Sequence, residues 1–575
     1  MIVDLFIFSL DLYIRYILLF IYFLLIGRSF FILLNKLMLK QTTTNNLIFD
    51  TKATIVYPII GLIFFGNLLI IANFFVELQN NVLYVFLVLL LLPNFIGNNK
   101  GIFKISHVLT FENIFLYIFI PGILLISSSD INFHYDAAYY HLNHQNWLRS
   151  SNLIIGSVNI FWPFGMSSIY EYISSMLWFN NSLIYLHFLN LIFLQFLFSF
   201  IFYHLFNSTN KNFKFASIFL VIFSIFDNFG ISGGRNGFVY IQEIGKQDTT
   251  VAILFCITSI LILDKIQKKY ASKIDIVLIS FLVFFIFEIK VSGVIIFILY
   301  FILIFILIRN NEYKFRSLIY LQSPTILFGL IWSLKSIMTT GCLIFPLSFT
   351  CYESFWWYEI GSTERVEAYT TATSFSFMEY FLDENLNFLD WVNYFLFSET
   401  NSTFSNYYLS VYSNFLISFV VLLFIKNFLF NKKVLDKRFK LILLTYITLS
   451  IVYLIFYGPI PRYSMGILIT VICSIGFFVD SEKVKISKYV FYSLFIMSIG
   501  LLPRAASYQN FIENKEISLF DPRAESQYIE VQINENWIKP ASGDRCWINL
   551  KCTMEDKIVN IVQSNYFKFA YKENT

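Results

Sequence analysis

The chain has 575 residues, of which 57% are hydrophobic and 14% are charged. Soluble proteins carry charge on roughly a quarter of their residues, so this composition excludes an ordinary soluble protein and indicates a polytopic membrane protein. The formal net charge is only +4, and no basic patch of the kind that binds nucleic acid remains once the lysines and arginines are assigned to membrane topology.

Apolar windows long enough to cross a hydrocarbon core recur along the whole chain. About 14 such windows are present, which predicts an all-α bundle of about 14 transmembrane helices. The pair on either side of Lys290 is equally compatible with one long or broken element. The windows lie at about residues 10–35, 53–77, 82–98, 110–127, 182–206, 212–229, 249–264, 274–289, 291–308, 316–338, 408–430, 440–458, 463–480 and 486–503.

Lysines and arginines concentrate in every second connection between these windows, for example around Lys36, Lys268 and Lys485. The positive-inside rule makes those connections cytoplasmic. The loops 128–181, 227–248 and 339–407 and the tail 504–575 are then expected on the outer side, with interfacial helices in the loops and a small extracytoplasmic cap in the tail. Residues 1–109 form a three-span scaffold, and residues 110–503 form the core.

The first outer loop opens on the densest cluster of ionisable, histidine and aromatic residues, DINFHYDAAYYHLNHQNW. If the chain is helical from residue 136, one face carries Asp136, Tyr140, Asn143 and Trp147, and His141 and His144 share the neighbouring face. We interpret this cluster as a reactive centre, although an interfacial aromatic belt predicts the same composition. Further on, Glu171 suits a site residue or, as the favoured interpretation, a solvated glutamate on the polar face of an interfacial helix.

The second outer loop ends with Lys246 and Asp248 just before a span. Asp248 suits a catalytic role and a helix N-cap equally well, and the loop lacks the glycine patterns of nucleotide-binding sites. Lys290, between two apolar runs, needs a partner at that depth. Glu288 is the local candidate, and a phosphate is the functional one.

In the third outer loop, Trp356 and Trp357 offer flat apolar faces suited to sugar rings. Arg462, bracketed by two prolines at the outer end of a span, suits either a bidentate phosphate contact or an interfacial snorkel. Cysteines in the expected outer segments predict two local disulfides in an oxidising compartment. The pairs are Cys342 with Cys351 and Cys546 with Cys552.

Several short motifs together resemble a family of bacterial polytopic membrane proteins encoded among surface-polysaccharide genes. They begin with YDAAYYHLNHQNWL, GSVN and FGMSS in the first outer loop. They continue in order with Lys290–Gly293, Thr340–Pro346, Pro459–Tyr463 and Cys546–Thr553. That family is similar in layout to the GT-C glycosyltransferases, which use a polyprenyl-phosphate sugar and carry an essential acidic residue in the first outer loop of the core.

The resemblance implies an integral membrane glycosyltransferase of surface polysaccharide biosynthesis in the bacterial inner membrane. It would move a sugar from a polyprenyl-phosphate-linked donor to a glycan or lipid-linked acceptor on the extracytoplasmic face. An oligosaccharide polymerase or ligase of similar architecture and a lipid-linked glycan flippase are the alternatives. A transporter is expected to place its charges near the membrane midplane, whereas here they collect at the outer ends of spans.

Carried over by motif, the essential acid is Asp136, which would accept the acceptor proton or bind a metal, with His141 and Asp248 as secondary partners. No cofactor is certain; Mg²⁺ or Mn²⁺ at Asp136 fits this interpretation, and zinc held by Asp136 with His134, His141 and His144 is a weaker alternative. The donor phosphate is expected at Lys246, Lys290 and Arg462. The sugar is expected against Tyr140, Trp147, Trp356 and Trp357.

Overall fold

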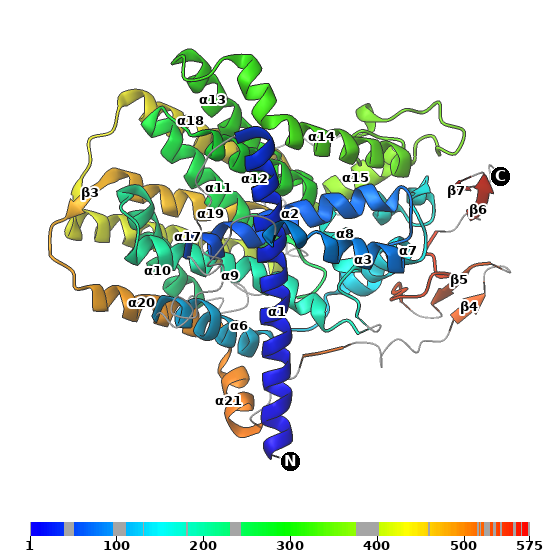
Figure 1. Cartoon of the computed structure of the whole chain (residues 1–575), viewed down its shortest axis with the longest axis horizontal. Helices are drawn as coiled ribbons and strands as arrows, with labels where there is room; N and C mark the ends of the chain where they lie inside the picture. Colours follow the sequence, from blue (N-terminus) through cyan, green and yellow to red (C-terminus); the bar gives the residue numbers. More distant parts are fainter. Residues whose placement is uncertain are drawn as a thin grey trace.

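The computed structural model describes residues 2–39, 51–95, 111–129, 131–179, 182–229, 243–374, 402–457 and 460–514. In the tail it describes residues 517, 519–521, 530–532, 536–540, 543–555, 559–564 and 566–572. Two parts of the expected outer loops, residues 230–242 and 375–401, lie outside the described residues, and with them the interfacial helices predicted in the second half of the loop 339–407. The described chain is a bundle of helices with a few short strands at its edges (Figure 1).

Ten helical segments of the described chain are long and apolar enough to cross a membrane, or eleven if the bent pair α20 and α21 is one span. Helices of this length and composition fit an all-α polytopic membrane protein. The segments are α1 (Ile2–Leu34), α2 (Thr51–Asn73), α5 to α6 (Phe111–Ser128), α9 (Tyr185–Phe206), α11 (Asp248–Lys268), η7 with α13 (Val291–Arg309), α14 (Phe315–Thr340), α17 (Ser402–Leu429), α18 (Lys437–Tyr457) and α19 with η10 (Pro461–Phe478).

The other four expected windows are also helical where the structure describes them, but they do not pass as single spans of this length and composition. They are α3 (Asn81–Leu89), α10 (Lys211–Phe229), α12 (Lys273–Ile289) and α20 (Lys488–Gly500), the last followed by α21 (Ala505–Asn514). The count of about 14 therefore stays a prediction. The break at Lys290 is real in the structure, because α12 ends at Ile289 and Lys290 has an extended backbone.

Glycines let α1 and α2 cross at close range. A Cβ on Gly27 would lie 1.9 Å from the carbonyl oxygen of Tyr57, and one on Gly61 would lie 2.0 Å from that of Phe23. No side chain fits at either point. Small residues at helix crossings are the usual means of close packing inside a membrane, where hydrophobic burial between helices contributes little.

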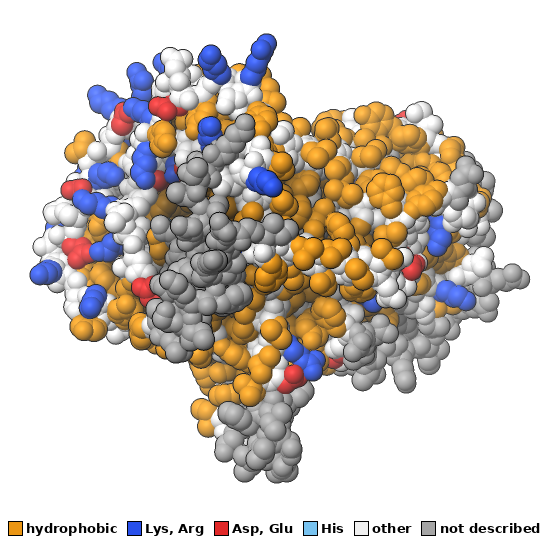
Figure 2. Space-filling view, viewed as in Figure 1, with side chains coloured by type: hydrophobic (Ala, Val, Ile, Leu, Met, Phe, Trp, Pro, Cys, Tyr) orange, Lys and Arg blue, Asp and Glu red, His pale blue; other side chains and the backbone are white. Residues whose placement is uncertain are grey.

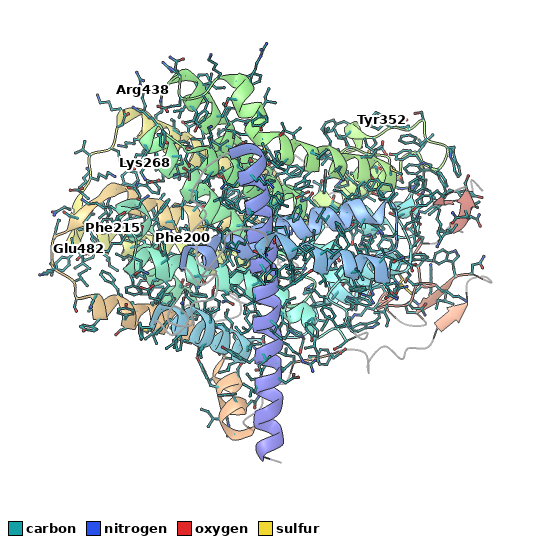
Figure 3. All side chains as sticks on the ribbon, in the orientation of Figure 1. Phe200, Phe215, Lys268, Tyr352, Arg438 and Glu482 are labelled. Carbon is teal, nitrogen blue, oxygen red and sulfur yellow. A yellow bond between two sulfur atoms is a disulfide. The ribbon has the colours of Figure 1, made fainter. Side chains whose placement is uncertain are left out.

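On the visible face, most Lys and Arg side chains gather at one end of the molecule (Figure 2). Figure 3 labels Lys268, Arg438 and Glu482 at this end and Tyr352 near the opposite end. In Figure 2, Lys and Arg side chains gather over the same end, and hydrophobic side chains cover much of the rest of the visible face. The antiparallel pair β2 (Phe430–Lys432) and β3 (Val479–Glu482) also lies there. We call it the basic end, and the opposite one the outer end.

The C-terminal tail packs on the first loop through strands that the sequence analysis did not predict. Strand β7 (Phe567–Lys572) pairs in parallel with β1 (Ile154–Ile155) and antiparallel with β6 (Val559–Ser564). A separate hairpin joins β4 (Glu530–Gln532) to β5 (Ile538–Pro540). The backbone N–H of Trp547 donates to the carbonyl of Ala138 at 2.8 Å. The described tail is thus fastened to the loop that carries Asp136.

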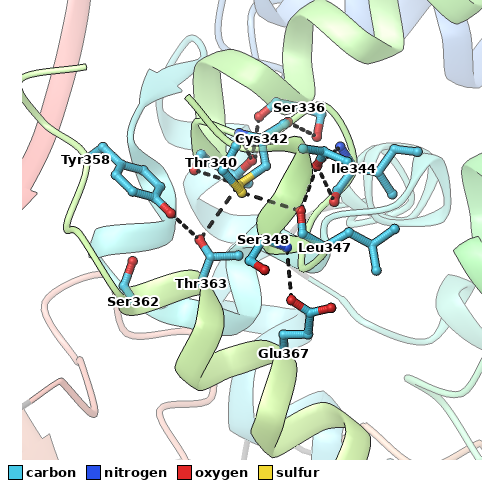
Figure 4. The surroundings of a disulfide bond; sticks show 12 residues. Ser336, Thr340, Cys342, Ile344, Leu347, Ser348, Tyr358, Ser362, Thr363 and Glu367 are labelled. Atoms are coloured by element: carbon cyan, nitrogen blue, oxygen red, sulfur yellow. Dashed lines mark hydrogen bonds between the residues drawn. A yellow bond between two sulfur atoms is a disulfide. The ribbon is translucent and has the colours of Figure 1, made fainter. Parts of the chain in front are cut away.

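Both cysteine pairs expected from the sequence are bonded in the structure, Cys342 to Cys351 and Cys546 to Cys552. The first bond closes the turn that follows α14, as Figure 4 shows. Around it, the Tyr358 hydroxyl donates to Thr363 at 2.9 Å, and the carboxylate of Glu367 accepts the backbone N–H of Ser348 at 3.0 Å. These contacts tie the turn to α15 (Ser362–Ser374).

Candidate functional site

The site begins where two outer loops meet. The backbone N–H of His134 donates to the carbonyl of Ile244 at 2.8 Å, and the N–H of Ile244 donates to the carbonyl of Asn132 at 3.1 Å. Gly245 follows with φ of +96°, and a Cβ there would lie 2.9 Å from the Cβ of Ala137. Only glycine suits this backbone and this contact. Gly245 was not among the residues predicted from the sequence. Its position directly before Lys246 and Asp248 is the sequence signal that could have identified it.

This junction brings Asp136 against Lys246. The Lys246 Nζ lies 2.5 Å from Oδ2 of Asp136, and the two side chains are 14% and 28% exposed. Burial alone would raise the pKa of Asp136, but the charge and hydrogen bond of Lys246 outweigh it and hold the pKa at about 2. Burial lowers the pKa of Lys246, and the nearby charge of Arg462 lowers it further. Asp136 is therefore ionised at neutral pH.

A second ion pair lies beside the first. Asp248, 2% exposed in the first turn of α11, accepts a hydrogen bond from the ammonium of Lys290 in the break between α12 and η7. Asp248 does not cap the helix, since Gln247 occupies the N-cap position. Glu288, the expected local partner of Lys290, instead accepts from Asn67 Nδ2 at 3.1 Å.

Tyr463 lies between two cations at the start of α19. The Nζ of Lys290 is 4.6 Å from the centre of its ring, and the Cζ of Arg462 is 5.0 Å from it. Arg462 also donates to the Tyr463 hydroxyl at 3.2 Å. A cation over an aromatic face is stabilised by the ring quadrupole. We call the whole set the outer ion cluster: Asp136, Lys246, Asp248, Lys290, Arg462 and Tyr463.

The outer ion cluster contains one more cationic side chain than carboxylates. Its three cations face two carboxylates, and each carboxylate is paired with a lysine. Within the described residues Arg462 has no carboxylate within 4 Å, and its buried Nε makes no hydrogen bond. Asp248 and Asp136 stabilise its charge only from a distance, and an enclosed guanidinium is matched better by an anion in direct contact. Such an arrangement favours the binding of an anion.

A pocket opens directly beside this surplus charge. It is small, with a cavity volume of about 20 Å³, and four members of the outer ion cluster, Asp248, Lys290, Arg462 and Tyr463, form its polar wall. The other wall is mostly apolar: Val251, Ala252, Phe255, Ser292, Gly293, Ile295, Gly466 and Ile467. These residues come from α11, η7 and α19. The pocket therefore joins a cationic wall to an apolar one at the ends of membrane helices.

His141 and Glu171 form a buried pair behind Asp136. His141 Nδ1 lies 2.5 Å from Oε1 of Glu171, and the residues are 6% and 3% exposed. Glu171 is therefore not on a solvated face, and that expectation was wrong. The physical reason is that α8 (Ile169–Ser175) is not interfacial but packs between α2, α7 (Leu142–Ser150) and α12, so all its residues are buried.

The four expected sugar-binding aromatics do not form one surface. Tyr140 and Trp147 pack in a cluster with Trp537, whereas Trp357 and its neighbours form another. Trp357 is 5% exposed, and Trp356, 65% exposed, contacts Phe569 and Tyr571 of the tail. The single helical face expected from residue 136 is also changed, because Ala137–His141 forms a π-helical turn, which shifts the register of the residues after it.

Two aromatic residues that the sequence analysis did not select lie beside Asp136. Tyr135 and Tyr139 stack with ring centres 5.5 Å apart. Tyr135 is 40% exposed, and the guanidinium of Arg545 lies 5.2 Å from its ring centre. Tyr135 and Tyr139 stand four residues apart on either side of Asp136, and two side chains at this spacing meet on a helix surface. This spacing is the sequence signal that could have identified them.

The residues around Asp136 do not fit a metal site. Within the described chain no three His, Cys, Asp or Glu side chains come close enough to share an ion. The partner of Asp136 is an ammonium, and its second neighbour is His134 at 3.5 Å. His141 turns to Glu171, and the ring of His144 packs on Phe164 at 4.9 Å. The described residues therefore offer no ligand set for the expected Mg²⁺, Mn²⁺ or zinc.

Comparison with known proteins identifies one family. Residues 10–469 match the family described as "Domain of unknown function (DUF8201)", so the match contains every member of the outer ion cluster. No curated protein matches the chain, and no solved structure matches it.

Proposed function

The chain belongs to the family described as a domain of unknown function (DUF8201), and we propose that it is an integral membrane glycosyltransferase. In this proposal it moves a sugar from a polyprenyl-phosphate-linked donor to a glycan or lipid-linked acceptor, at the extracytoplasmic face of the bacterial inner membrane. The products belong to surface polysaccharide. A polymerase or ligase that moves a whole oligosaccharide uses the same site chemistry and is the nearest variant.

The observation that carries the proposal is the surplus charge of Arg462 beside Lys246 and Lys290. A phosphate diester brings one negative charge and would leave the outer ion cluster neutral. A guanidinium fork suits its two free oxygens. The apolar side chains beside these cations, from α11, η7 and α19, would contact the first isoprene units of the lipid. An outward-facing transferase needs such a membrane-dissolved donor, because nucleotide sugars are cytoplasmic.

In the transfer, the bond from the sugar C1 to the phosphate oxygen breaks, and the phosphate keeps the electron pair. Lys246, Lys290 and Arg462 stabilise that charge, which is the usual largest contribution to catalysis of this type. Asp136 has a pKa of about 2 and is therefore a weak proton acceptor. Its role is instead to stay ionised beside the positive charge that develops at C1. This replaces the role of base expected for it.

A transporter is the second candidate function, because two ionisable side chains are buried within the helical bundle. Glu288 in α12 is 1% exposed, and its Oε1 has no hydrogen-bond partner among the described residues. Lys335 in α14 is 2% exposed and donates to the carbonyl of Ser167 at 2.6 Å. Buried charges of this kind are typical of translocation pathways.

The experiment uses purified protein in liposomes with a panel of radiolabelled polyprenyl-phosphate sugars and membrane-extracted acceptors. Asp136→Asn should lower transfer about 100-fold or more, the usual scale for losing one preorganised electrostatic group. The matched control is Asp436→Asn at the basic end, which pairs with Lys269 at 3.0 Å and should leave transfer unchanged. Near-normal transfer by Asp136→Asn removes Asp136 from the mechanism. Movement of labelled lipid across the bilayer without a new glycosidic bond indicates a transporter.

A further inference from the structure

The proposed transfer needs a proton acceptor, and the ion pair of Asp136 leaves that role open. We propose that His141 takes the proton of the acceptor hydroxyl and that Glu171 is its positioning residue. This inference rests on the proposed function. The proton transfer is thereby assigned to the buried pair of His141 and Glu171, which lies next to the outer ion cluster.

Glu171 is held by three side chains that leave it no freedom to turn. Its Oε1 contacts His141 Nδ1 at 2.5 Å and accepts from Gln247 Nε2 at 3.0 Å, and its Oε2 accepts from Gln145 Nε2 at 2.8 Å. The two glutamines are themselves held, because Trp178 donates to Gln145 at 2.9 Å and Ser168 donates to Gln247 at 3.2 Å. Such a satisfied network fixes the direction of the imidazole ring.

The same contact sets the tautomer of His141. Burial alone would raise the pKa of Glu171, but the charge and hydrogen bond of His141 keep it lowered. A carboxylate at Nδ1 holds the ring proton on that nitrogen and leaves the lone pair on Nε2. Nε2 makes no hydrogen bond to any described residue, and it is not one of the fully enclosed polar atoms without a partner. It therefore borders accessible space and is free to accept a proton.

The position of His141 suits this role. It follows Asp136 by five residues across the π-helical turn and acts electrostatically on it. The titratable and charged groups around it come from four segments. Those that act on it or contact it are His134, Asp136, Tyr140 and His144 from its own loop and helix and Glu171 from α8, while Lys246 and Arg462, from two further segments, act on its neighbours His134 and Asp136 or Tyr140.

The other two histidines of the loop are unsuited to accept a proton. Burial and the charge of Lys246 lower the pKa of His134 to about 4, and burial lowers the pKa of His144 to about 3. Efficient general bases have a pKa near the working pH. Neither residue has a carboxylate hydrogen-bonded at the opposite ring nitrogen, since His134 Nδ1 accepts the backbone N–H of Asp136 at 3.0 Å.

The proton step balances without a further reactant. The acceptor O–H gives its proton to Nε2 of His141, and its oxygen forms the new bond to C1 of the donor sugar. The bond from C1 to the phosphate oxygen breaks, and the leaving lipid phosphate carries the electron pair. The imidazolium that forms is stabilised by Glu171, and it returns its proton to water after product release.

The first test needs no substrate. Diethyl pyrocarbonate reacts with an accessible, unprotonated imidazole nitrogen, and mass spectrometry of peptides measures the rate at each histidine. His141 should react at neutral pH although its residue is 6% exposed, whereas the 1% exposed His187 should not. In Glu171→Gln, His141 should react more slowly, because the carboxylate that fixes the ring and holds its proton on Nδ1 is lost. The rate at His134 should stay unchanged.

An unreactive His141 in the wild-type protein, or an unchanged rate at His141 in Glu171→Gln, overturns the proposal and leaves the proposed function standing. The second test is transfer. His141→Ala should lose about 100-fold or more, the usual scale for a general base, and added imidazole should restore part of it, while polyprenyl phosphate should still bind. A purely structural role predicts no imidazole rescue. If the wild-type protein itself transfers no sugar, the proposed function fails, and the reactivity of His141 still reports on the pair.

Discussion

The two ends of the molecule use the same residue types in opposite ways. At the basic end, lysines pair with carboxylates across exposed connections, as in Lys211 with Asp480 at 3.5 Å and side chains 64% and 55% exposed. At the outer end, Lys290 pairs with an Asp248 that is 2% exposed. Most paired lysines of the basic end are exposed, although Lys268 reaches the buried Asp264. The outer end encloses the guanidinium of Arg462 without a carboxylate within 4 Å among the described residues.

This difference in exposure separates charges expected to set membrane topology from charges expected to bind a ligand. Exposed pairs contribute about 0–1 kcal/mol each to stability, and lysines gathered at one end of a helical bundle are what the positive-inside rule expects of a cytoplasmic face. Enclosed charges cost free energy unless they are matched, so an enclosed surplus is retained for a ligand more readily than for stability. On this argument, position in the fold, more than residue type, distinguishes the outer ion cluster from the many other charges of the chain.

The largest expected effect comes from breaking one enclosed pair. Lys290→Met leaves Asp248 buried without its partner and should lower the free energy of unfolding by about 3 kcal/mol or more. Lys211→Met, the matched change at the basic end, should change it by less than about 1 kcal/mol. Thermal unfolding of the two variants in the same detergent makes the comparison, and equal effects would remove the distinction between the ends.

The next effect concerns the disulfides, which the structure places at the outer end. Replacing Cys342 and Cys351 by serine opens a loop with a sequence separation of 9 and should cost about 2–3 kcal/mol. Cys256 and Cys473, both buried and unbonded, should tolerate reducing agent without change. Mass spectrometry of non-reduced protein should recover both outer pairs as linked peptides, and four free thiols would argue against an oxidising outer side.

The smallest effect is acid sensitivity of the Asp136 ion pair. The pKa of Asp136 is lowered from 3.8 to about 2 in the fold, so its stabilisation is present above about pH 4 and is lost as the pH falls through 2. The contribution is on the order of 2 kcal/mol. The difference in thermal midpoint between wild type and Asp136→Asn should be constant from pH 5 to neutrality and should shrink toward pH 2. A difference that shrinks near pH 6 would contradict the assignment.

The cationic part of the outer ion cluster could be predicted from the sequence, because it depends on where each residue stands relative to an apolar window. Lys246, Lys290 and Arg462 each stand at an end of an apolar window, and helices that share a membrane bring such ends to one level. The structure brings all three into one cluster. The broken element at Lys290 followed from the same pattern, since a charge between two apolar runs is compatible with a break.

The remainder depends on contacts that no local pattern records. Glu171 stands in a short segment of mixed polarity, and only the packing of α8 between three helices decides that it is buried. The π-helical turn at Ala137–His141 shifts the register after Asp136 by a detail of backbone geometry. Strand β1 pairs with β7, which lies about 410 positions further along the chain. Strands of two and six residues are too short for a sequence pattern to predict such a pairing.

The central claim is that the outer ion cluster binds a lipid phosphate, and direct binding of a polyprenyl monophosphate to protein in nanodiscs tests it. Arg462→Gln should weaken binding by about 10- to 100-fold, which corresponds to losing charge-assisted hydrogen bonds of about 1.5–3 kcal/mol. Arg438→Gln at the basic end, where the side chain is exposed, should bind as wild type does. Equal affinity of wild type and Arg462→Gln would contradict the claim.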